Sequence, residues 1–160
     1  EQVIVCPAQV KKHKSVTGKQ EGIQVMNILV LDDDACVLDA MRSMLQAKGH
    51  HVDAVDHALA ALRLMKKHTY DMVFFDYVMP DKDGLWFLEH ADLPARTTAV
   101  LMTGYGTADL INNALELGAS GYILKPFTMD QLMQHMAFYT TQEKAGRLRH
   151  DESLALSTAQ

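Results

Sequence analysis

A chain of 160 residues, 48% of them hydrophobic, is long enough to bury one real core. The formal net charge of -5 excludes a general basic surface, so we expect no nucleic-acid partner for this chain. No apolar run approaches the ~20 residues that span a bilayer, and no signal-peptide pattern precedes the apolar segments. We therefore expect a cytoplasmic protein that has no membrane partner.

The first part of the chain, residues 1–24, has no sustained period of 2 or 3.6, which predicts a disordered extension. A regular pattern begins at residue 25, and the apolar run at 28–31 predicts a strand. Apolar residues at helical spacing follow it: Val37, Leu38, Met41, Met44 and Leu45. A strand followed by a helix is therefore the opening unit of the predicted domain.

This alternation of strand and helix recurs four more times along the chain. The further strands are predicted at 52–55, 72–75, 99–102 and 122–124, and the further helices at 58–67, from 85, at 107–117 and at 129–139. The pattern is lost after residue 140. Residues 25–140 are therefore the predicted folded domain, and residues 141–160 are a C-terminal tail or the start of a linker.

The apolar runs of the first, third and fourth strands are continuous, which indicates burial on both faces of a parallel sheet covered by helices. The second strand contains Asp53 and follows His50 and His51, which favours an edge position. Five strand-helix units with strand order 2-1-3-4-5 make a doubly wound α/β domain, the flavodoxin-like (βα)5 fold.

In open parallel sheets, ligands bind outside the carboxyl ends of the strands. Polar side chains stand at four of these ends: Asp32, Asp33 and Asp34, Asp76, Thr103 and Lys125. Carboxylates that lie close together raise one another's pKa unless a cation neutralises them, so the cluster predicts a bound metal. All candidate ligands are oxygens, which suits Mg²⁺, or Mn²⁺ in its place.

With a metal bound, Asp76 is predicted to act as a nucleophile toward phosphorus and to form an acyl phosphate, while Lys125 and the Thr103 hydroxyl meet the phosphoryl oxygens. Taken singly, Asp76 is equally well explained as a turn aspartate, while a solvated lysine and a satisfied strand-end hydroxyl explain Lys125 and Thr103 better than a function does. Asp34 is expected to cap the following helix. The joint placement at successive strand ends favours a functional site.

Four segments carry a family resemblance: ILVLDDD at 28–34, DYVMPDKDG at 76–84, MTG at 102–104 and GASGYILKPF at 118–127. In this order and spacing, the chain resembles the receiver domains of bacterial response regulators from about residue 26 to residue 140. The resemblance implies a two-component phospho-acceptor. Asp76 would receive a phosphoryl group from a phosphohistidine of a histidine kinase or a phosphotransfer protein.

The resemblance also implies the ligands of the metal and the parts of a switch. Asp32 and Asp33 would hold Mg²⁺ together with Asp76, and the backbone carbonyl of Val78 would complete the protein ligands. Thr103 would reorient toward the phosphoryl group and Tyr122 would swing inward, although a half-buried strand tyrosine needs no such role. The peptide bond before the proline that follows Lys125 would be cis.

An output protein is expected on the face formed by the fourth helix, the fifth strand and the fifth helix, and the chain would be a monomer or a weak phosphorylation-dependent dimer. The residues at 141–160 are too few to form an effector domain. The chain is therefore expected to be a stand-alone regulator, or else a receiver fragment of a longer response regulator or hybrid kinase. The basic residues Lys144, Arg147 and Arg149 are consistent with the start of a linker.

Two other functions fit less well. Aspartyl-nucleophile phosphatases of the haloacid dehalogenase type resemble a pattern with a second aspartate two residues after the nucleophile, where this chain has Val78. A flavodoxin-like domain that binds FMN needs a loop of Ser, Thr or Gly after the first strand, and three aspartates would repel the phosphate. We therefore expect no turnover enzyme, only self-phosphorylation from a phosphodonor and self-dephosphorylation.

Overall fold

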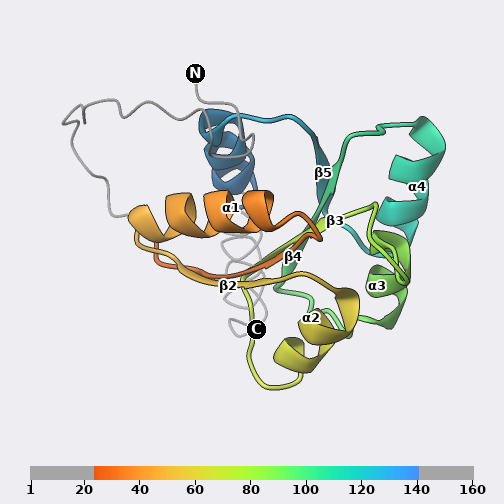
Figure 1. Cartoon of the computed structure of the whole chain (residues 1–160), viewed down its shortest axis with the longest axis horizontal. Coiled ribbons are helices and arrows are strands. Elements are labelled where there is room, and N and C mark those ends of the chain that lie inside the picture. The colour runs from red at the N-terminus through yellow and green to blue at the C-terminus, as the bar shows by residue number, and fades with distance from the viewer. Residues whose placement is uncertain (1–23, 141–160) are drawn as a thin grey trace, which may run out of the picture.

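The computed structural model describes residues 24–140, so the expectations for the N-terminal extension up to residue 23 and for the tail of 141–160 lie outside the described residues. The strands are β1 (Asn27–Leu31), β2 (His51–Val55), β3 (Met72–Asp76), β4 (Thr98–Thr103) and β5 (Gly121–Leu124). They form one parallel sheet in the order β2-β1-β3-β4-β5 (Figure 1). The predicted fold class and strand order are confirmed.

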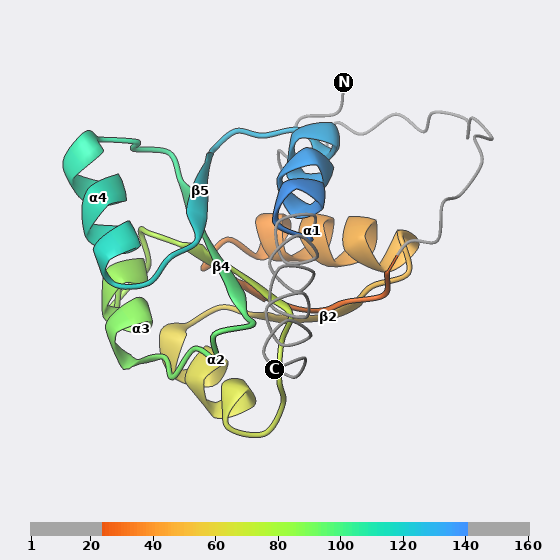
Figure 2. The same ribbon diagram turned by 180° about the vertical axis from the view of Figure 1, so that it is seen from behind.

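Helices cover both faces of this sheet. They are α1 (Ala35–Ala47), α2 (Ala58–Met65), α3 (Gly84–His90), α4 (Ala108–Glu116) and a last helix whose described part is residues 129–140, here called the C-terminal helix. α1 and the C-terminal helix lie on one face, whereas α2, α3 and α4 lie on the other (Figures 1 and 2). None of these described helices is long and apolar enough to cross a membrane.

Each face of the sheet has its own hydrophobic core, because successive side chains of a strand point to opposite faces. In β1, Ile28 and Val30 pack with α1 and the C-terminal helix, while Leu29 and Leu31 pack with α2 and α3. All four side chains are completely buried. The continuous apolar run that predicted a two-sided strand therefore corresponds to two separate cores.

The weaker second strand is the edge strand β2, as predicted, and it is only partly buried. Its Asp53 accepts a hydrogen bond from the Tyr70 hydroxyl at 2.6 Å, so the acidic residue within the strand has a partner. The predicted ends of three helices differ from the observed ones by one or two residues, and one of them is α4, which runs from Ala108 to Glu116 and was predicted at 107–117. α2 ends at Met65 instead of residue 67, and α3 begins at Gly84 because Asp83 caps it.

The register of the parallel sheet aligns the ends of its strands. Leu31 pairs with Phe75, and Asp76, the last residue of β3, pairs with Met102. Thr103 pairs with Leu124 at the ends of β4 and β5. As a result, the residues that end or follow β1, β3, β4 and β5 meet at one edge of the sheet.

Candidate functional site

The three aspartates that follow β1 occupy three different environments. Asp32 is completely buried, and its carboxylate accepts a hydrogen bond from the Asp34 backbone N–H at 3.0 Å. Asp33 is exposed to solvent. Asp34 accepts the Cys36 N–H at 2.8 Å and so caps α1, as predicted. The turn therefore directs one carboxylate into the sheet edge and leaves the next one open to water.

Asp76 is the last residue of β3, and only 7% of its surface is exposed. The chain returns to it at the start of α3, where the Gly84 N–H donates to the Tyr77 carbonyl at 2.9 Å. A Cβ atom on Gly84 would lie 2.4 Å from the Asp76 carbonyl oxygen, so no larger residue fits without a shift of the backbone. Sequence reasoning missed this role, because a glycine at the end of a loop looks the same whether it supports a turn or a close approach.

The carboxylates of Asp32, Asp33 and Asp76 converge, with one oxygen of each within 4.8 Å of the others. Two of these groups are buried and one is exposed, which leaves an open side toward solvent. A donor set made only of carboxylate oxygens suits a hard divalent cation that keeps some of its waters. These residues therefore fit Mg²⁺, as expected, and Mn²⁺ has the same preference for oxygen.

Val78 lies in the loop after β3, and 53% of its surface is exposed. Its position two residues after Asp76 is compatible with the predicted contribution of its backbone carbonyl to a metal. That contribution stays a prediction.

Lys125 follows β5, and its ammonium lies between two carboxylates. It is 2.5 Å from an oxygen of Asp32 and 3.1 Å from an oxygen of Asp76. The Lys125 backbone N–H donates to the Thr103 carbonyl at 2.8 Å, which keeps the residue beside the end of β4. The peptide bond between Lys125 and Pro126 is cis, as expected from the resemblance. The structure thus brings Asp32, Asp33, Asp76 and Lys125 together.

The electrostatics of this cluster leave an excess of negative charge. Burial raises the pKa of Asp76, and the Asp32 charge raises it further, while Lys125 opposes both. Burial alone would lower the pKa of Lys125, but its hydrogen bonds and its attraction to Asp32 and Asp76 raise it above the ordinary value. Lys125 therefore stays an ammonium, and one such cation does not balance three carboxylates.

Thr103 is completely buried at the end of β4, but its hydroxyl is engaged with the loop that follows. The hydroxyl donates to the Tyr105 carbonyl at 3.3 Å and accepts the Tyr105 N–H at 3.0 Å. Within residues 24–140, no hydrogen bond joins it to Asp76 or Lys125. The predicted residue therefore lies at the sheet edge that bears the site, while its side chain is held by its own loop.

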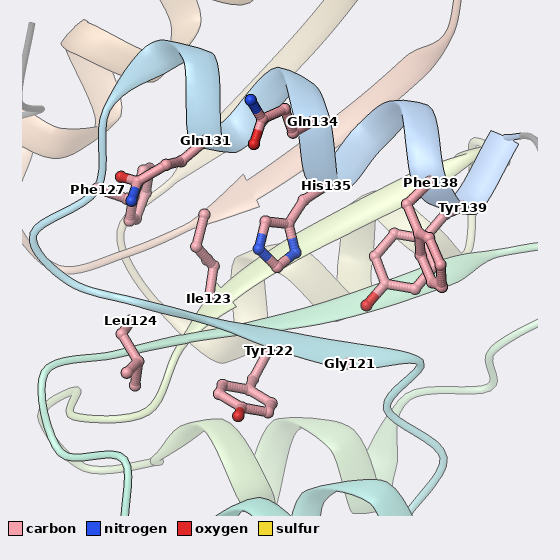
Figure 3. A pocket seen from close by; sticks show the side chains of 10 residues that line it. All are labelled: Gly121, Tyr122, Ile123, Leu124, Phe127, Gln131, Gln134, His135, Phe138 and Tyr139. Atoms are coloured by element: carbon pink, nitrogen blue, oxygen red, sulfur yellow. The ribbon is translucent and has the colours of Figure 1, made fainter. Parts of the chain in front are cut away.

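Tyr122 is not part of the carboxylate cluster. It lies in β5 beside Leu101, and 38% of its surface is exposed. Figure 3 shows its ring on the side of β5 opposite to Ile123, which points toward the C-terminal helix. The structure thus has the predicted switch tyrosine in an outward position, and its inward movement stays a prediction.

The fold and the cluster define a class of protein: a flavodoxin-like domain with converging carboxylates at the carboxyl ends of its strands. The family described as the response regulator receiver domain matches residues 28–137, which is more than half of the chain. The chain therefore belongs to the receiver domain family of two-component response regulators, and the resemblance inferred from the sequence is confirmed.

Relatives of the chain include regulators from plants and bacteria. It is 35% identical over 109 residues to the two-component response regulator ARR11 of Arabidopsis thaliana, which covers 67% of this chain and 21% of ARR11. It is 31% identical over 137 residues to the response regulator protein FleR of Pseudomonas aeruginosa, which covers 82% of this chain and 28% of FleR. The chain thus spans well under a third of the length of these two relatives.

Solved structures share the fold. The CheY-like receiver domain protein from Methanospirillum hungatei JF-1 superposes with a TM-score of 0.70 at 29% identity, over 76% of this chain and 99% of that protein. The chemotaxis protein CheY4 of Vibrio cholerae superposes with a TM-score of 0.68 at 21% identity, over 72% of this chain and 98% of that protein. This second likeness concerns the fold alone.

Proposed function

We propose that this receiver domain takes a phosphoryl group on Asp76 from a phosphohistidine of a histidine kinase or a phosphotransfer protein. One observation carries the proposal. The nearly buried Asp76 carboxylate has oxygens of Asp32 and Asp33 within 4.8 Å and the Lys125 ammonium at 3.1 Å. A nucleophilic carboxylate that is surrounded by groups able to hold cations and to pair with phosphoryl oxygens suits phosphoryl transfer.

In the proposed reaction, a carboxylate oxygen of Asp76 bonds to phosphorus as the P–N bond of the phosphohistidine breaks, and the imidazole nitrogen keeps the electron pair. Lys125 donates hydrogen bonds to one phosphoryl oxygen, and the Thr103 hydroxyl, once it leaves Tyr105, donates to another. Asp32, Asp33, Asp76 and the Val78 carbonyl would hold Mg²⁺ or Mn²⁺. When bound, this ion supplies the positive charge that neutralises the crowded oxygens.

The proposed output follows from the release of Thr103 from its loop. Tyr122 would then turn inward and reshape the face made by α4, β5 and the C-terminal helix, which an output protein reads. In this proposal residues 25–140 act as the receiver, as a stand-alone regulator or as part of a longer protein, without contact to nucleic acid or membrane. Formation and hydrolysis of the acyl phosphate would serve signalling in the cytoplasm and not metabolic turnover.

A phosphatase of the aspartyl-nucleophile type is the less supported alternative. It needs an acid or base two residues after the nucleophile to speed hydrolysis of the acyl phosphate. Here that residue is Val78, whose side chain has no proton to exchange. Without this acid or base we expect slow hydrolysis of the acyl phosphate. A long-lived acyl phosphate suits a signalling protein better than a turnover enzyme.

The test is intact-mass analysis after incubation with acetyl phosphate. We expect a single addition of roughly 80 Da for one phosphoryl group. The addition should require Mg²⁺, disappear with chelator, and be absent in Asp76→Asn. This variant should keep its fold, because the replacement is nearly isosteric and removes one charge from a crowded cluster.

Labelling that persists in Asp76→Asn would move the acceptor to another residue. No addition to the wild type under any condition would overturn the proposal and indicate a receiver that acts through constitutive protein contacts.

A further inference from the structure

The loop between β3 and α3, residues 77–83, contains a strained turn. The Lys82 backbone N–H donates to the Pro80 carbonyl at 2.7 Å, and the residue between them, Asp81, has a φ of 64°. A hydrogen bond that spans one residue with positive φ is typical of the rarer and more strained form of the γ-turn. Strained backbone of this kind persists only where the surrounding structure holds it. The turn therefore depends on anchors outside itself.

The backbone on both sides of this turn is anchored. Before it, Met79 is buried in the core between the sheet and the helices α2, α3 and α4. After it, Asp83 caps α3 by accepting the Trp86 N–H at 2.8 Å. Pro80 and Asp81 themselves are exposed to solvent, so packing of their own side chains does not hold the turn.

The side chain of Lys82 gives the turn a further anchor on α3. Its ammonium lies over the indole of Trp86, 4.6 Å from the ring centroid. His90 stacks on the same indole with ring centroids 4.0 Å apart, and its Nδ1 lies 2.8 Å from the Trp86 carbonyl oxygen. An ammonium over an indole is attracted by the negative face of the ring. Lys82 thus ties the strained turn to the helix that follows it.

The ring is the partner of Lys82 although acids stand next to it in the sequence. Asp81 and Asp83 flank it, and it is the only Lys or Arg between residues 68 and 95. Among residues 24–140, the ion pairs that lysine makes with aspartate all belong to Lys125. The contact with Trp86 therefore fixes the direction of the Lys82 side chain.

We propose that Lys82 is a positioning residue of the metal site, because its contact with Trp86 holds the β3–α3 loop in the arrangement that offers the Val78 carbonyl to the cation. Val78 lies two residues before Pro80, and its side chain is 53% exposed, so its own packing does not fix it. A loop that is already ordered loses less conformational freedom when an ion binds, and the ion binds more tightly. The inference rests on the proposed function, since it gives a support to the proposed ligand Val78.

Other roles of Lys82 predict different effects on Mg²⁺. A cation in this loop repels a divalent ion, so loss of Lys82 would strengthen Mg²⁺ binding if only its charge mattered. A contact that merely stabilised the fold would stabilise the metal-free and the metal-bound form equally and leave the affinity for Mg²⁺ unchanged. Of these three roles, only the positioning role predicts weaker binding when the contact is lost.

The experiment measures the affinity of the full chain for Mg²⁺ from the rise in the midpoint of urea unfolding as the ion is added. Lys82→Met keeps the apolar stem and loses the ammonium. It should weaken Mg²⁺ binding about twofold to fivefold, as expected for an exposed cation–π contact. Lys82→Arg should stay within about twofold of the wild type, because a guanidinium also stacks on an indole.

The matched control is Lys67→Met. Lys67 is exposed and lines a cavity with Asn27 and His51, the first residues of β1 and β2, so it lies at the amino-terminal edge of the sheet. This change should leave the affinity for Mg²⁺ unchanged. Circular dichroism checks that each variant is folded.

A double variant tests whether Trp86 is the partner through which Lys82 acts. Trp86→Leu should weaken Mg²⁺ binding about as much as Lys82→Met, and both changes together should weaken it no more than either alone, because they remove the same contact. Trp86 is the single tryptophan of the chain, so its fluorescence reports the contact directly. In chelator, the emission of Lys82→Met should differ from that of the wild type, and the emission of Lys67→Met should not.

Mg²⁺ binding by Lys82→Met that is as tight as in the wild type, or tighter, would overturn the inference, and so would additive losses in the double variant. Intact mass after incubation with acetyl phosphate reports phosphorylation in the same samples. A wild type that binds Mg²⁺ but never gains a phosphoryl group contradicts the proposed function alone. A wild type that is labelled, but whose Mg²⁺ affinity does not depend on Lys82, contradicts the positioning role alone. A wild type that Mg²⁺ does not stabilise contradicts both.

Discussion

The surroundings of Asp76 disfavour a negative charge and raise its pKa. It is nearly buried, and it shares its pocket with the carboxylates of Asp32 and Asp33. At a separation of about 5 Å, two like charges repel by about 3 kcal/mol if the effective dielectric constant is near 20. Attraction to Lys125 offsets only part of this repulsion. Without a metal, the ionised acceptor therefore weakens the fold that presents it.

A stability measurement on Asp76→Asn tests this electrostatic cost. In the presence of chelator, we expect the variant to be more stable than the wild type by about 1–2 kcal/mol, because two repulsions are removed and one attraction is lost. Urea unfolding at neutral pH measures the difference. Glu89→Gln, which changes an exposed acid far from any such cluster, controls for the loss of one charge. A less stable Asp76→Asn would mean that the ion pair with Lys125 outweighs the repulsion.

A second buried titratable side chain, His50, lies away from the site. The Met26 N–H donates to its Nδ1 at 3.3 Å, so this nitrogen carries no proton. Its Nε2 is buried and has no hydrogen-bond partner among the described residues. Burial lowers the pKa of His50 below the ordinary value of 6.5. The folded state therefore holds a neutral imidazole that the unfolded chain would protonate more readily.

The expected pH dependence follows from this difference. Because the folded pKa is lowered, the unfolded state binds the proton first as pH falls, so the contribution of His50 is complete above pH 6.5 and is lost as pH falls through the lowered folded pKa. Urea unfolding of wild type and His50→Gln between about pH 8 and about pH 5 measures this. We expect a smaller loss of stability in the variant, and equal losses would contradict the assignment. In NMR titration, the imidazole of His50 should protonate below its ordinary pKa of 6.5.

At the scale of elements, the start of α3 is packed directly against the end of β3. Gly84→Ala should destabilise the domain by about 2–3 kcal/mol, because the added methyl group would lie 2.4 Å from the Asp76 carbonyl oxygen and must push strand and helix apart. Thermal unfolding should shift by about 4 °C per kcal/mol. Gly104→Ala is the matched control, since nothing lies within 4 Å of its added Cβ. A Gly84→Ala variant as stable as Gly104→Ala would contradict this prediction, because it would show that the start of α3 moves away from the end of β3 at little cost in free energy.

The elements themselves were predictable from the sequence because burial on both faces of a central strand leaves a continuous apolar run. β1 and β3 are such strands, and the sequence also marked β2 as the edge strand through Asp53. The ends of helices were less predictable, because α2 stops at Met65 although Lys66 still donates a backbone hydrogen bond to Leu62. The last turn of such a helix loses its helical geometry over one or two residues, so no residue type in the sequence marks the position where the helix ends.

The site was predictable as a set of strand ends, but not in its side-chain contacts. Parallel strands fix where Asp32, Asp76 and Lys125 come together, whatever their rotamers. The bond between the Thr103 hydroxyl and Tyr105 depends on one χ1 angle and on the loop conformation, which no sequence pattern encodes. The close approach of Gly84 to Asp76 was hidden for a similar reason, since it depends on how a loop returns to the sheet.

For the whole molecule, the site ties together segments that are far apart in the chain. Lys125 joins Asp32 across 93 positions of sequence. Asp32 directly follows β1, and Asp76 is the last residue of the neighbouring strand β3. A ligand of this site contacts both strands at once. Since these strands are buried except for Asn27 at the start of β1, binding should resist unfolding of the entire domain and not only of one loop.

Binding of Mg²⁺ should therefore raise global stability, by about 2.7 kcal/mol when the free ion is at about 100 times its dissociation constant. Asp33→Asn is the sharpest variant, because replacing its exposed carboxylate removes repulsion toward Asp32 and Asp76, which solvent partly screens, and so leaves the metal-free fold at least as stable as the wild type. We expect it to keep or gain stability in chelator and to need at least about tenfold more Mg²⁺ for the same gain, which removes about 1.4 kcal/mol at a fixed concentration. Urea unfolding with and without Mg²⁺ measures both quantities. If Mg²⁺ stabilised Asp33→Asn as much as it stabilises the wild type at every concentration, the ion would bind elsewhere. The link between the ends of β1 and β3 would then have to come from Lys125 alone.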